Sequence, residues 1–166
     1  MTAKSRILVY GYGNPGRQDD GLGVAFAAEL QAWLRDHKMA HVSVDSNYQL
    51  NIEDAVAVAE NDIVIFVDAS TAAIDCFRLT DVAPSHKVAF TMHAVGPAFI
   101  LALCRELYNK CPETYILQIK GYEWGMRETL TPGARQNLDQ ALAFLQAALQ
   151  ELENQPASLK LSAVNP

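Results

Sequence analysis

Hydrophobic positions along the chain change their spacing repeatedly, from continuous apolar runs to a helical repeat. Five short segments have the β-branched and aromatic content that is typical of strands. They cover residues 6–11, 42–45, 62–68, 77–82 and 115–120. The segment 62–68 is apolar between its two terminal aspartates, which is typical of a central parallel strand buried on both faces. The segment 77–82 alternates polar and apolar residues and indicates an edge strand.

Four further segments repeat apolar residues every three to four positions, as amphipathic helices do. We expect the first to begin at the aspartate pair 19–20, the second to be a short helix capped by Asn51, and the third to begin near Gly96. The last has Thr131 as its N-cap and Pro132 at its first helical position. The apolar stripes of the three longer helices are Leu22, Phe26, Leu30 and Trp33; Phe99, Ile100, Leu103, Cys104 and Leu107; and Leu138, Leu142, Leu145, Leu149 and Leu152.

This alternation of strands and helices predicts a single α/β domain over residues 1–153, with residues 154–166 as a mobile tail. We expect a twisted, mostly parallel sheet of about five strands between helix layers. In such a sheet the residues that follow parallel strands meet at one edge, where ligands bind. Gly11, Asp68 and Gly121 each follow a predicted strand, as does Asp45. The chemistry is therefore expected at this edge.

Composition and charge narrow the classes of function. Half of the 166 residues are apolar and 19% are charged, which is a globular balance. A net charge of −6 disfavours nucleic acid and anionic membranes as partners. No segment has the length of a transmembrane helix or the pattern of a signal peptide, so we expect a cytoplasmic protein, and we expect a monomer. The three cysteines lack metal-binding or disulfide spacing, and Cys104 is expected in the core.

Two alternative functions match isolated motifs but not their context. Residues 11–16 fit the G-x-G-x-x-G pattern of a dinucleotide-binding loop and follow a strand. However, Pro15 removes a backbone donor, and the helix begins only after the acidic pair 19–20, at the place where a phosphate would bind. A serine hydrolase based on Ser70 lacks the G-x-S-x-G elbow, and a turn after the strand accounts for this serine.

Three residues at the predicted strand-end edge form a possible metal-ligand set: Asp20, Asp68 and His93. Carboxylates combined with an imidazole suit nickel, zinc or cobalt better than calcium. Three protein ligands leave coordination positions open for water or a substrate group. Each aspartate also has a structural interpretation, because Asp20 is placed to cap a helix and Asp68 to hold the turn after its strand. Both interpretations stay open at this point.

The ordered set of motifs resembles the nickel–iron hydrogenase maturation endopeptidases. The resemblance covers nearly the whole chain apart from its C-terminal tail. It rests on the glycine-rich loop with its acidic end, on a dipeptide after the central strand, on a histidine before a helix, and on two short motifs near the last helix. These motifs are Gly11-Tyr12-Gly13-Asn14-Pro15, Asp19-Asp20-Gly21-x-Gly23-Val24, Asp68-Ala69, His93, Gly121-Tyr122-Glu123 and Leu130-Thr131-Pro132.

The resemblance implies a substrate and a metal. Members of this family remove the C-terminal extension of a hydrogenase large-subunit precursor after nickel has been inserted. By position, the nickel contacts correspond to Asp20, Asp68 and His93, with Asp19 as the other choice in the first loop. The nickel then belongs to the precursor and is not a permanent cofactor. Only a nickel-loaded precursor would dock, because an empty one leaves the carboxylates without their cation.

The resemblance also implies a peptidase, of the aspartyl type. In one version nickel polarises the scissile carbonyl or activates water, while an aspartate accepts the proton. In another version nickel only positions the extension. A nickel-binding accessory protein that does not cleave the precursor is the alternative from another class, followed by a nucleotide-binding module. Tyr12, Tyr48 and Trp124 are candidates either for a partner-binding surface or for ordinary packing.

Overall fold

The computed structural model describes residues 3–87 and 95–154. His93 and residues 155–166 of the predicted tail lie outside the described residues. The strands are β1 (Ile7–Tyr12), β2 (Val42–Asn47), β3 (Ile63–Ser70), β4 (Phe77–Asp81) and β5 (Glu113–Lys120). The helices are α1 (Leu22–His37), α2 (Asp54–Ala59), α3 (Pro97–Tyr108) and α4 (Pro132–Asn154), with a short 3-10 helix, η1 (Gln18–Gly21), before α1.

The strands form one sheet in the order β2-β1-β3-β5-β4. β1, β2, β3 and β5 run parallel, and β4 pairs antiparallel with β5 at one edge. β3 therefore lies in the middle, and its residues 63–67 are buried, as the apolar run between aspartates predicted. The predicted α/β class, mostly parallel sheet and edge strand are confirmed. The parallel strands also bring their carboxyl ends to one side of the sheet, as expected.

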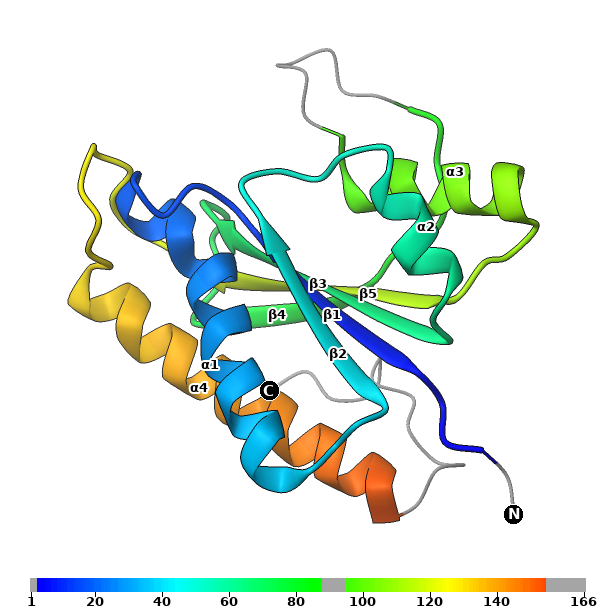
Figure 1. Ribbon diagram of the computed structural model, residues 1–166. Coiled ribbons are helices and arrows are strands. Elements are labelled where there is room, and N and C mark those ends of the chain that lie inside the picture. Colours follow the sequence, from blue (N-terminus) through cyan, green and yellow to red (C-terminus); the bar gives the residue numbers. More distant parts are fainter. Residues whose placement is uncertain (1–2, 88–94, 155–166) are drawn as a thin grey trace.

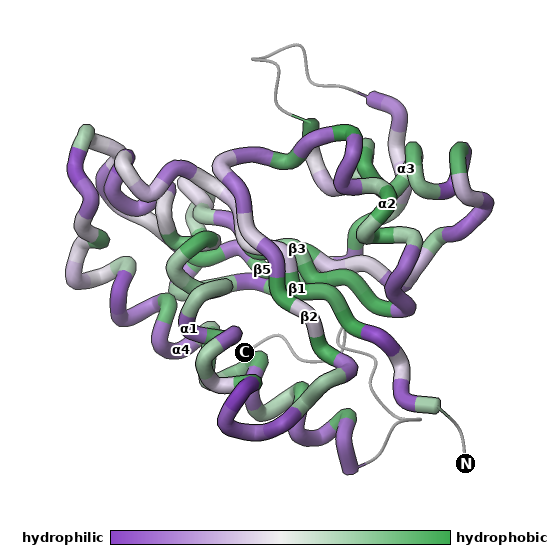
Figure 2. Tube along the Cα trace, viewed as in Figure 1, coloured by the Kyte–Doolittle hydropathy of each residue, from purple (hydrophilic) through white to green (hydrophobic). Residues whose placement is uncertain are grey.

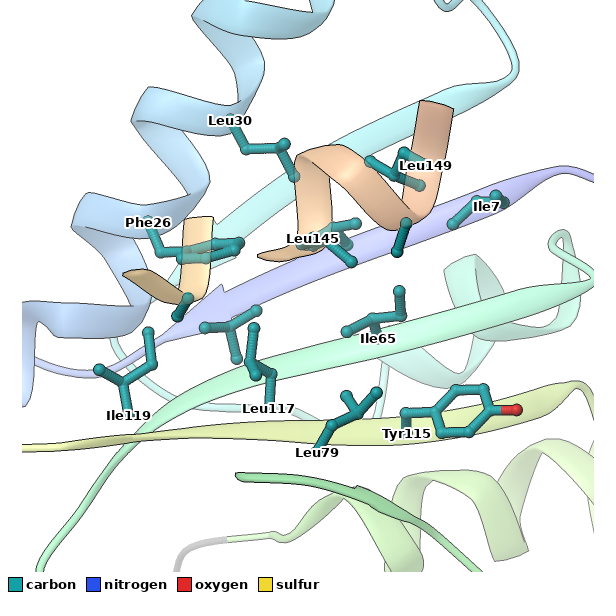
Figure 3. Close-up of a cluster of buried hydrophobic side chains, with 14 of the residues drawn as sticks. Ile7, Phe26, Leu30, Ile65, Leu79, Tyr115, Leu117, Ile119, Leu145 and Leu149 are labelled. Carbon is teal, nitrogen blue, oxygen red and sulfur yellow. The ribbon is translucent and has the colours of Figure 1, made fainter. Parts of the chain in front are cut away.

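Of the described helices, two cover each face of the sheet. Figure 1 shows α1 and α4 on one face and α2 and α3 on the other. The larger core lies under α1 and α4, where Phe26 and Leu30 meet Ile65 of β3 and Leu145 and Leu149 of α4 (Figure 3). Each such side chain, once buried, contributes about 1.5–3 kcal/mol to folding. Figure 2 shows the same division, with a hydrophobic sheet and hydrophilic positions along the outer sides of the helices.

The prediction that the aspartate pair 19–20 begins and caps the first helix is wrong. Residues 18–21 form η1 instead, and α1 begins at Leu22. Among the described residues no side chain makes a capping hydrogen bond at the N-cap of α1, Gly21. The carboxylates of Asp19 and Asp20 accept hydrogen bonds from elsewhere, as described below. Asn51 is not a side-chain cap either, because Glu53 precedes α2 and the backbone N–H of Asn51 donates to the carboxylate of Asp54 at 2.7 Å.

The predictions for the two later helices are largely confirmed. The hydroxyl of Thr131 accepts the backbone N–H of Ala134 at 3.2 Å, and Pro132 is the first residue of α4. Cys104 is fully buried in α3. Leu107 was assigned to the apolar stripe of α3, but it is 63% exposed because only one side of this helix packs on the sheet; Leu101 is buried instead.

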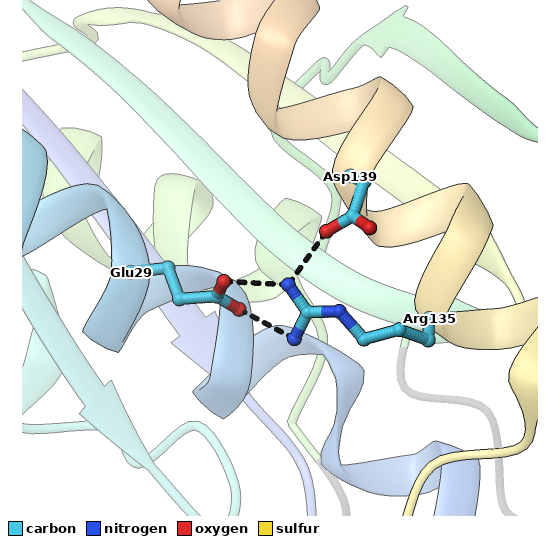
Figure 4. A network of polar contacts seen from close by, with 3 residues as sticks. All are labelled: Glu29, Arg135 and Asp139. Carbon is cyan, nitrogen blue, oxygen red and sulfur yellow. Dashed lines mark hydrogen bonds and ion pairs between the residues drawn. The ribbon is translucent and has the colours of Figure 1, made fainter.

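A polar contact on the surface joins the two helices of the larger core. The guanidinium of Arg135 on α4 binds both carboxylate oxygens of Glu29 on α1, at 2.9 and 2.5 Å, and one oxygen of Asp139 at 2.5 Å (Figure 4). All three side chains are partly exposed, so this contact adds little stability to that of the core. In the part of the chain that the structure describes, no helix has both the length and the apolar character needed to cross a membrane.

Candidate functional site

Glycines allow the backbones of β1, the loop that follows it and the start of α1 to come into direct contact. A Cβ on Gly11 would lie 2.0 Å from the carbonyl oxygen of Gly23, and a Cβ on Gly23 would lie 2.5 Å from the carbonyl oxygens of Tyr12 and Val67. Gly13 has φ +139° and would place a Cβ 2.0 Å from the carbonyl oxygen of Asp20. The glycine pattern thus serves close packing of the first loop and α1 against β1 and β3, and this packing accounts for it without a phosphate.

This loop fixes Asp20 in place. The Oδ2 atom of Asp20 accepts the backbone N–H of Asn14 at 2.8 Å, and the side chain is partly exposed. Asn14 in turn holds its own turn, because its Oδ1 accepts the N–H of Gly16 at 2.9 Å. Asp20 is therefore not a helix cap but a carboxylate held across the loop, at the carboxyl end of β1.

Asp68 lies within β3, which continues two residues further to Ser70 than the sequence indicated. Burial raises the pKa of Asp68 to about 7; hydrogen bonds from Tyr12 and the Ala69 backbone oppose this rise, and the charge of Asp20 adds to it. The two carboxylates are thus close enough to repel each other. The hydroxyl oxygen of Ser70 accepts the N–H of Ala72 at 3.1 Å in the turn after β3, whereas the carboxylate of Asp68 accepts the N–H of Ala69 within the strand.

Tyr12, the last residue of β1, lies beside Asp68. Burial and the charge of Asp68 raise the pKa of Tyr12 above its usual range, so its hydroxyl keeps its proton and can donate to Asp68. Its ring packs edge-on against Phe66, with 6.5 Å between centroids. Among the three aromatic candidates, Tyr12 and Trp124 are partly buried, whereas Tyr48 is 67% exposed.

Asp19 is fully buried and its carboxylate has four hydrogen-bond donors. Oδ2 accepts the backbone N–H groups of Tyr122 at 2.7 Å and Glu123 at 3.1 Å and the hydroxyl of Thr131 at 2.8 Å, while Oδ1 accepts the Thr131 N–H at 2.8 Å. Burial by itself raises the pKa of Asp19, but these hydrogen bonds outweigh it and hold the pKa below its ordinary value. With its oxygens used in this way, Asp19 supports the loop, and the geometry favours Asp20 as the first-loop ligand.

Gln18 is a site residue that sequence reasoning missed. It is buried and has φ +47°, a conformation that is unfavourable for a residue with a side chain. Its Nε2 donates to Glu123 at 3.0 Å, its Oε1 accepts the N–H of Gly125 at 2.8 Å, and its own N–H donates to the carbonyl of Arg127 at 2.7 Å. Most of these partners are backbone groups, which every residue carries, so the sequence pattern does not predict these contacts. Gln18 and Asp19 together join the first loop to the loop 121–131. Figure 1 shows these two loops side by side.

The described part of the site is a pair of carboxylates. Asp20 and Asp68 come together, whereas Asp45 is exposed and accepts the N–H of Ser46 at 2.8 Å on the outer strand β2. Gly121 lies next to Asp19, where a Cβ would be 2.8 Å from the aspartate's own Cβ. Within residues 3–87 and 95–154, no three His, Cys, Asp or Glu side chains are placed to hold a metal ion. The third predicted ligand, His93, lies outside these ranges.

Neither a family model nor a curated protein matches this sequence. Solved structures do share its fold. A [NiFe] hydrogenase maturation protease, HycI from Thermococcus kodakarensis KOD1, aligns over 90% of this chain and 95% of its own, with a TM-score of 0.73 and 20% identity. The hydrogenase maturating endopeptidase HybD from E. coli aligns over 88% and 93%, with a TM-score of 0.70 and 21% identity. A hydrogenase 2 maturation peptidase from a Thaumarchaeota archaeon aligns over 87% and 97%, with a TM-score of 0.60 and 18% identity. The fold that the resemblance implied is thus confirmed.

Proposed function

We propose that this protein is an endopeptidase that removes the C-terminal extension of a nickel–iron hydrogenase large-subunit precursor after nickel insertion. The observation that carries the proposal is the interacting carboxylate pair, Asp20 and Asp68, at the carboxyl end of the parallel strands. The fold supports it, because three solved structures with this fold are of hydrogenase maturation proteases or peptidases. In this proposal the protein is a cytoplasmic monomer whose partner is the precursor. A net charge of −6 disfavours nucleic acid or an anionic membrane in that role.

The nickel is part of the substrate in this proposal. Two carboxylates that repel each other gain stability when a divalent cation lies between them. Asp20 and Asp68 therefore bind nickel that the precursor already holds. His93 joins them on the basis of the resemblance alone. A precursor without nickel leaves the two carboxylates uncompensated, so binding discriminates against the unloaded form.

Asp68 is also the residue best suited to move a proton. Burial raises the pKa of Asp68 to about 7 in the protein without metal, so this carboxyl group can hold a proton near neutral pH before the precursor binds. In the proposed reaction Asp20 and Asp68 would hold the nickel of the precursor, which would polarise the scissile carbonyl. An Asp68 oxygen would accept a proton from the attacking water and return it to the amine of the released extension. The Tyr12 hydroxyl, which keeps its proton, can donate to Asp68 and would keep its carboxylate oriented.

Mass spectrometry of the precursor tests the proposal. The purified protein is mixed with the large-subunit precursor of the same organism, prepared with and without nickel, and the nickel content is measured beforehand. We expect loss of a C-terminal peptide from the loaded form only. Asp20→Asn and Asp68→Asn should abolish the loss, while Asp81→Asn, an exposed carboxylate at the end of β4, should not.

Each other outcome has a definite meaning. Cleavage of both precursor forms would keep the peptidase but remove the role of nickel in recognition. Retained cleavage by both aspartate variants would refute the proposed chemistry. If the loaded precursor binds but stays intact, the non-cleaving accessory protein is the correct function.

A further inference from the structure

Two cavities lie one after the other along β2, the outer strand of the sheet. The larger, about 440 Å³, lies between the last turns of α1 and the residues 42–44 of β2. The smaller, about 280 Å³, is lined by Pro15 of the first loop, Val24 of α1 and residues 46–48. Figure 1 shows α1 beside β2 along this side of the sheet. The smaller cavity thus adjoins the loop that holds Asp20, and the larger lies at the far end of the strand.

Two independent measures give the distance between the two cavities along β2. Val24 and Arg35 on α1 are eleven residues apart, which is about 16 Å along a helix. Asn47 and Val42 on β2 are five residues apart, which is about 16 Å along a strand. A peptide of about five extended residues therefore spans the distance from the first loop to the larger cavity.

The larger cavity combines an apolar floor with a cationic rim. Leu34, Met39 and Val42 belong to the buried core and form its floor, and Arg35 and Lys38 lie on its exposed rim. The cavity has no acidic lining residue, and in the part of the chain that the structure describes neither cation forms an ion pair. In a protein with a net charge of −6, this combination suits a carboxylate attached to an aliphatic group, such as the end of a peptide.

The backbone of β2 offers the rest of the contact. Among the described strands, β2 pairs only with β1, so its outer edge is open to an added strand. The N–H groups of Ser46 and Tyr48 are held by the side chains of Asp45 and Asn47, at 2.8 Å each. These short local hydrogen bonds can exchange for bonds to the carbonyl groups of a peptide, since both acceptor side chains are exposed and gain water in return.

We infer that the C-terminal extension of the precursor lies extended along β2, with its terminal carboxylate bound by Arg35 and Lys38. This inference rests on the proposed function. The extension leaves the carboxylate site at the first loop and runs antiparallel to β2, so its end reaches the cationic rim. Charge complementarity selects this occupant, because a free C-terminus is a feature that every uncleaved precursor carries and that an internal peptide lacks.

Two measurements on the full protein test the inference. The first is the rate of processing of the nickel-loaded precursor by the double variant Arg35→Gln, Lys38→Gln. We expect KM to rise about tenfold or more with kcat unchanged, the size that loss of a charge-assisted hydrogen bond produces. The control is Arg105→Gln, which removes an exposed cation from the last turn of α3 on the opposite face of the sheet. The single variant Arg35→Lys, which keeps both charges, should retain most of the affinity of the wild type.

The second measurement needs no cleavage. A fluorescent twelve-residue peptide that copies the end of the precursor is prepared with a free carboxylate and with a C-terminal amide, and binding is followed by anisotropy. We expect the acid to bind about tenfold more tightly, and the preference to vanish in the double variant. Circular dichroism and thermal unfolding confirm that the variants are folded.

The two measurements separate failure of the inference from failure of the proposed function. If the wild type processes the precursor while the double variant has an unchanged KM, the inference is overturned and the function stands. If the wild type does not process a verified nickel-loaded precursor, the proposed endopeptidase function is refuted. The peptide-binding measurement then tests the inference by itself. Equal binding of acid and amide would then overturn the inference as well, whereas a preference that depends on Arg35 and Lys38 would support this cavity as a site for peptide carboxylates.

Discussion

Asp19 and Thr131 lie 112 residues apart in the sequence, and the Asp19 carboxylate accepts both the N–H and the hydroxyl of Thr131, each at 2.8 Å. The oxygen of that hydroxyl also accepts the N–H of Ala134, so one side chain caps α4 and anchors it to the first loop. The position of Asp20, the next residue, thus depends on where α4 begins. A buried carboxylate with four donors thus links these distant segments, together with Gln18.

Removing the charge of Asp19 should destabilise the fold. In Asp19→Asn, the amide group brings N–H donors against the N–H groups of Tyr122 and Glu123, which leaves buried donors without an acceptor. We expect a loss of about 2–3 kcal/mol in the free energy of unfolding, measured by urea denaturation at pH 7. Asp139→Asn, which weakens only an exposed contact of Arg135, should cost less than about 0.5 kcal/mol. Equal losses in the two variants would contradict this role of Asp19.

The same carboxylate predicts a pH dependence of stability. The pKa of Asp19 is lower in the folded protein than its ordinary value, so its contribution is fully present above that ordinary value and is lost as the pH falls through the folded value. We expect the difference in melting temperature between the wild type and Asp19→Asn to be constant from pH 7 to about 5 and to shrink below about pH 4. A difference that stays the same down to pH 2 would show that protonation of Asp19 does not matter.

The sequence was sufficient for the sheet because burial on both faces forces continuous apolar runs, as in residues 63–67 of β3. It was sufficient for the start of α4 because a threonine cap followed by proline is a local signal. The prediction of the start of α1 was wrong because the signal there is not local. Asp19 has the right residue type for a cap, but its partners lie beyond residue 120, and no local rule ranks a distant backbone donor above a near one.

The candidate site was predictable in part for the same reasons. Asp68 was identified because it belongs to the central strand, and Asp20 because it ends a glycine-rich loop. The choice between Asp19 and Asp20 needed the hydrogen-bond partners of both. Gln18 had no signal at all, since its left-handed backbone and its contacts with Gly125 and Arg127 exist only once the two loops meet.

Substitutions of two glycines test whether the close contacts of Gly13 in the first loop are needed for stability. In Gly13→Ala, the new methyl group would lie 2.0 Å from the carbonyl oxygen of Asp20 at a φ of +139°, so the loop must move and Asp20 moves with it. We expect a stability loss of about 2 kcal/mol or more, with loss of processing activity. Gly96→Ala is the matched control, because none of the described residues has an atom within 4 Å of its added methyl group. Thermal unfolding of both variants checks this, and a Gly13→Ala protein as stable as Gly96→Ala would contradict it.

Asp68 should lower the stability of the fold that contains it. Because its pKa rises to about 7 in the folded protein, folding favours its protonated form, and stability falls as the pH rises from about 4 to about 7. Above that range the wild type carries the cost of a partly buried charge near Asp20, while Asp68→Asn carries none. A pKa of about 7 in place of the ordinary value corresponds to at most about 4 kcal/mol of stability, which the partial exposure of Asp68 reduces. We therefore expect Asp68→Asn to be more stable than the wild type by about 2–4 kcal/mol at pH 8 and nearly equal to it at pH 4. Urea denaturation at the two pH values, with Asp81→Asn as the control, measures the difference. A destabilised Asp68→Asn at pH 8 would mean that the carboxylate serves the fold, and the strongest physical argument for a functional carboxylate at this position would be lost.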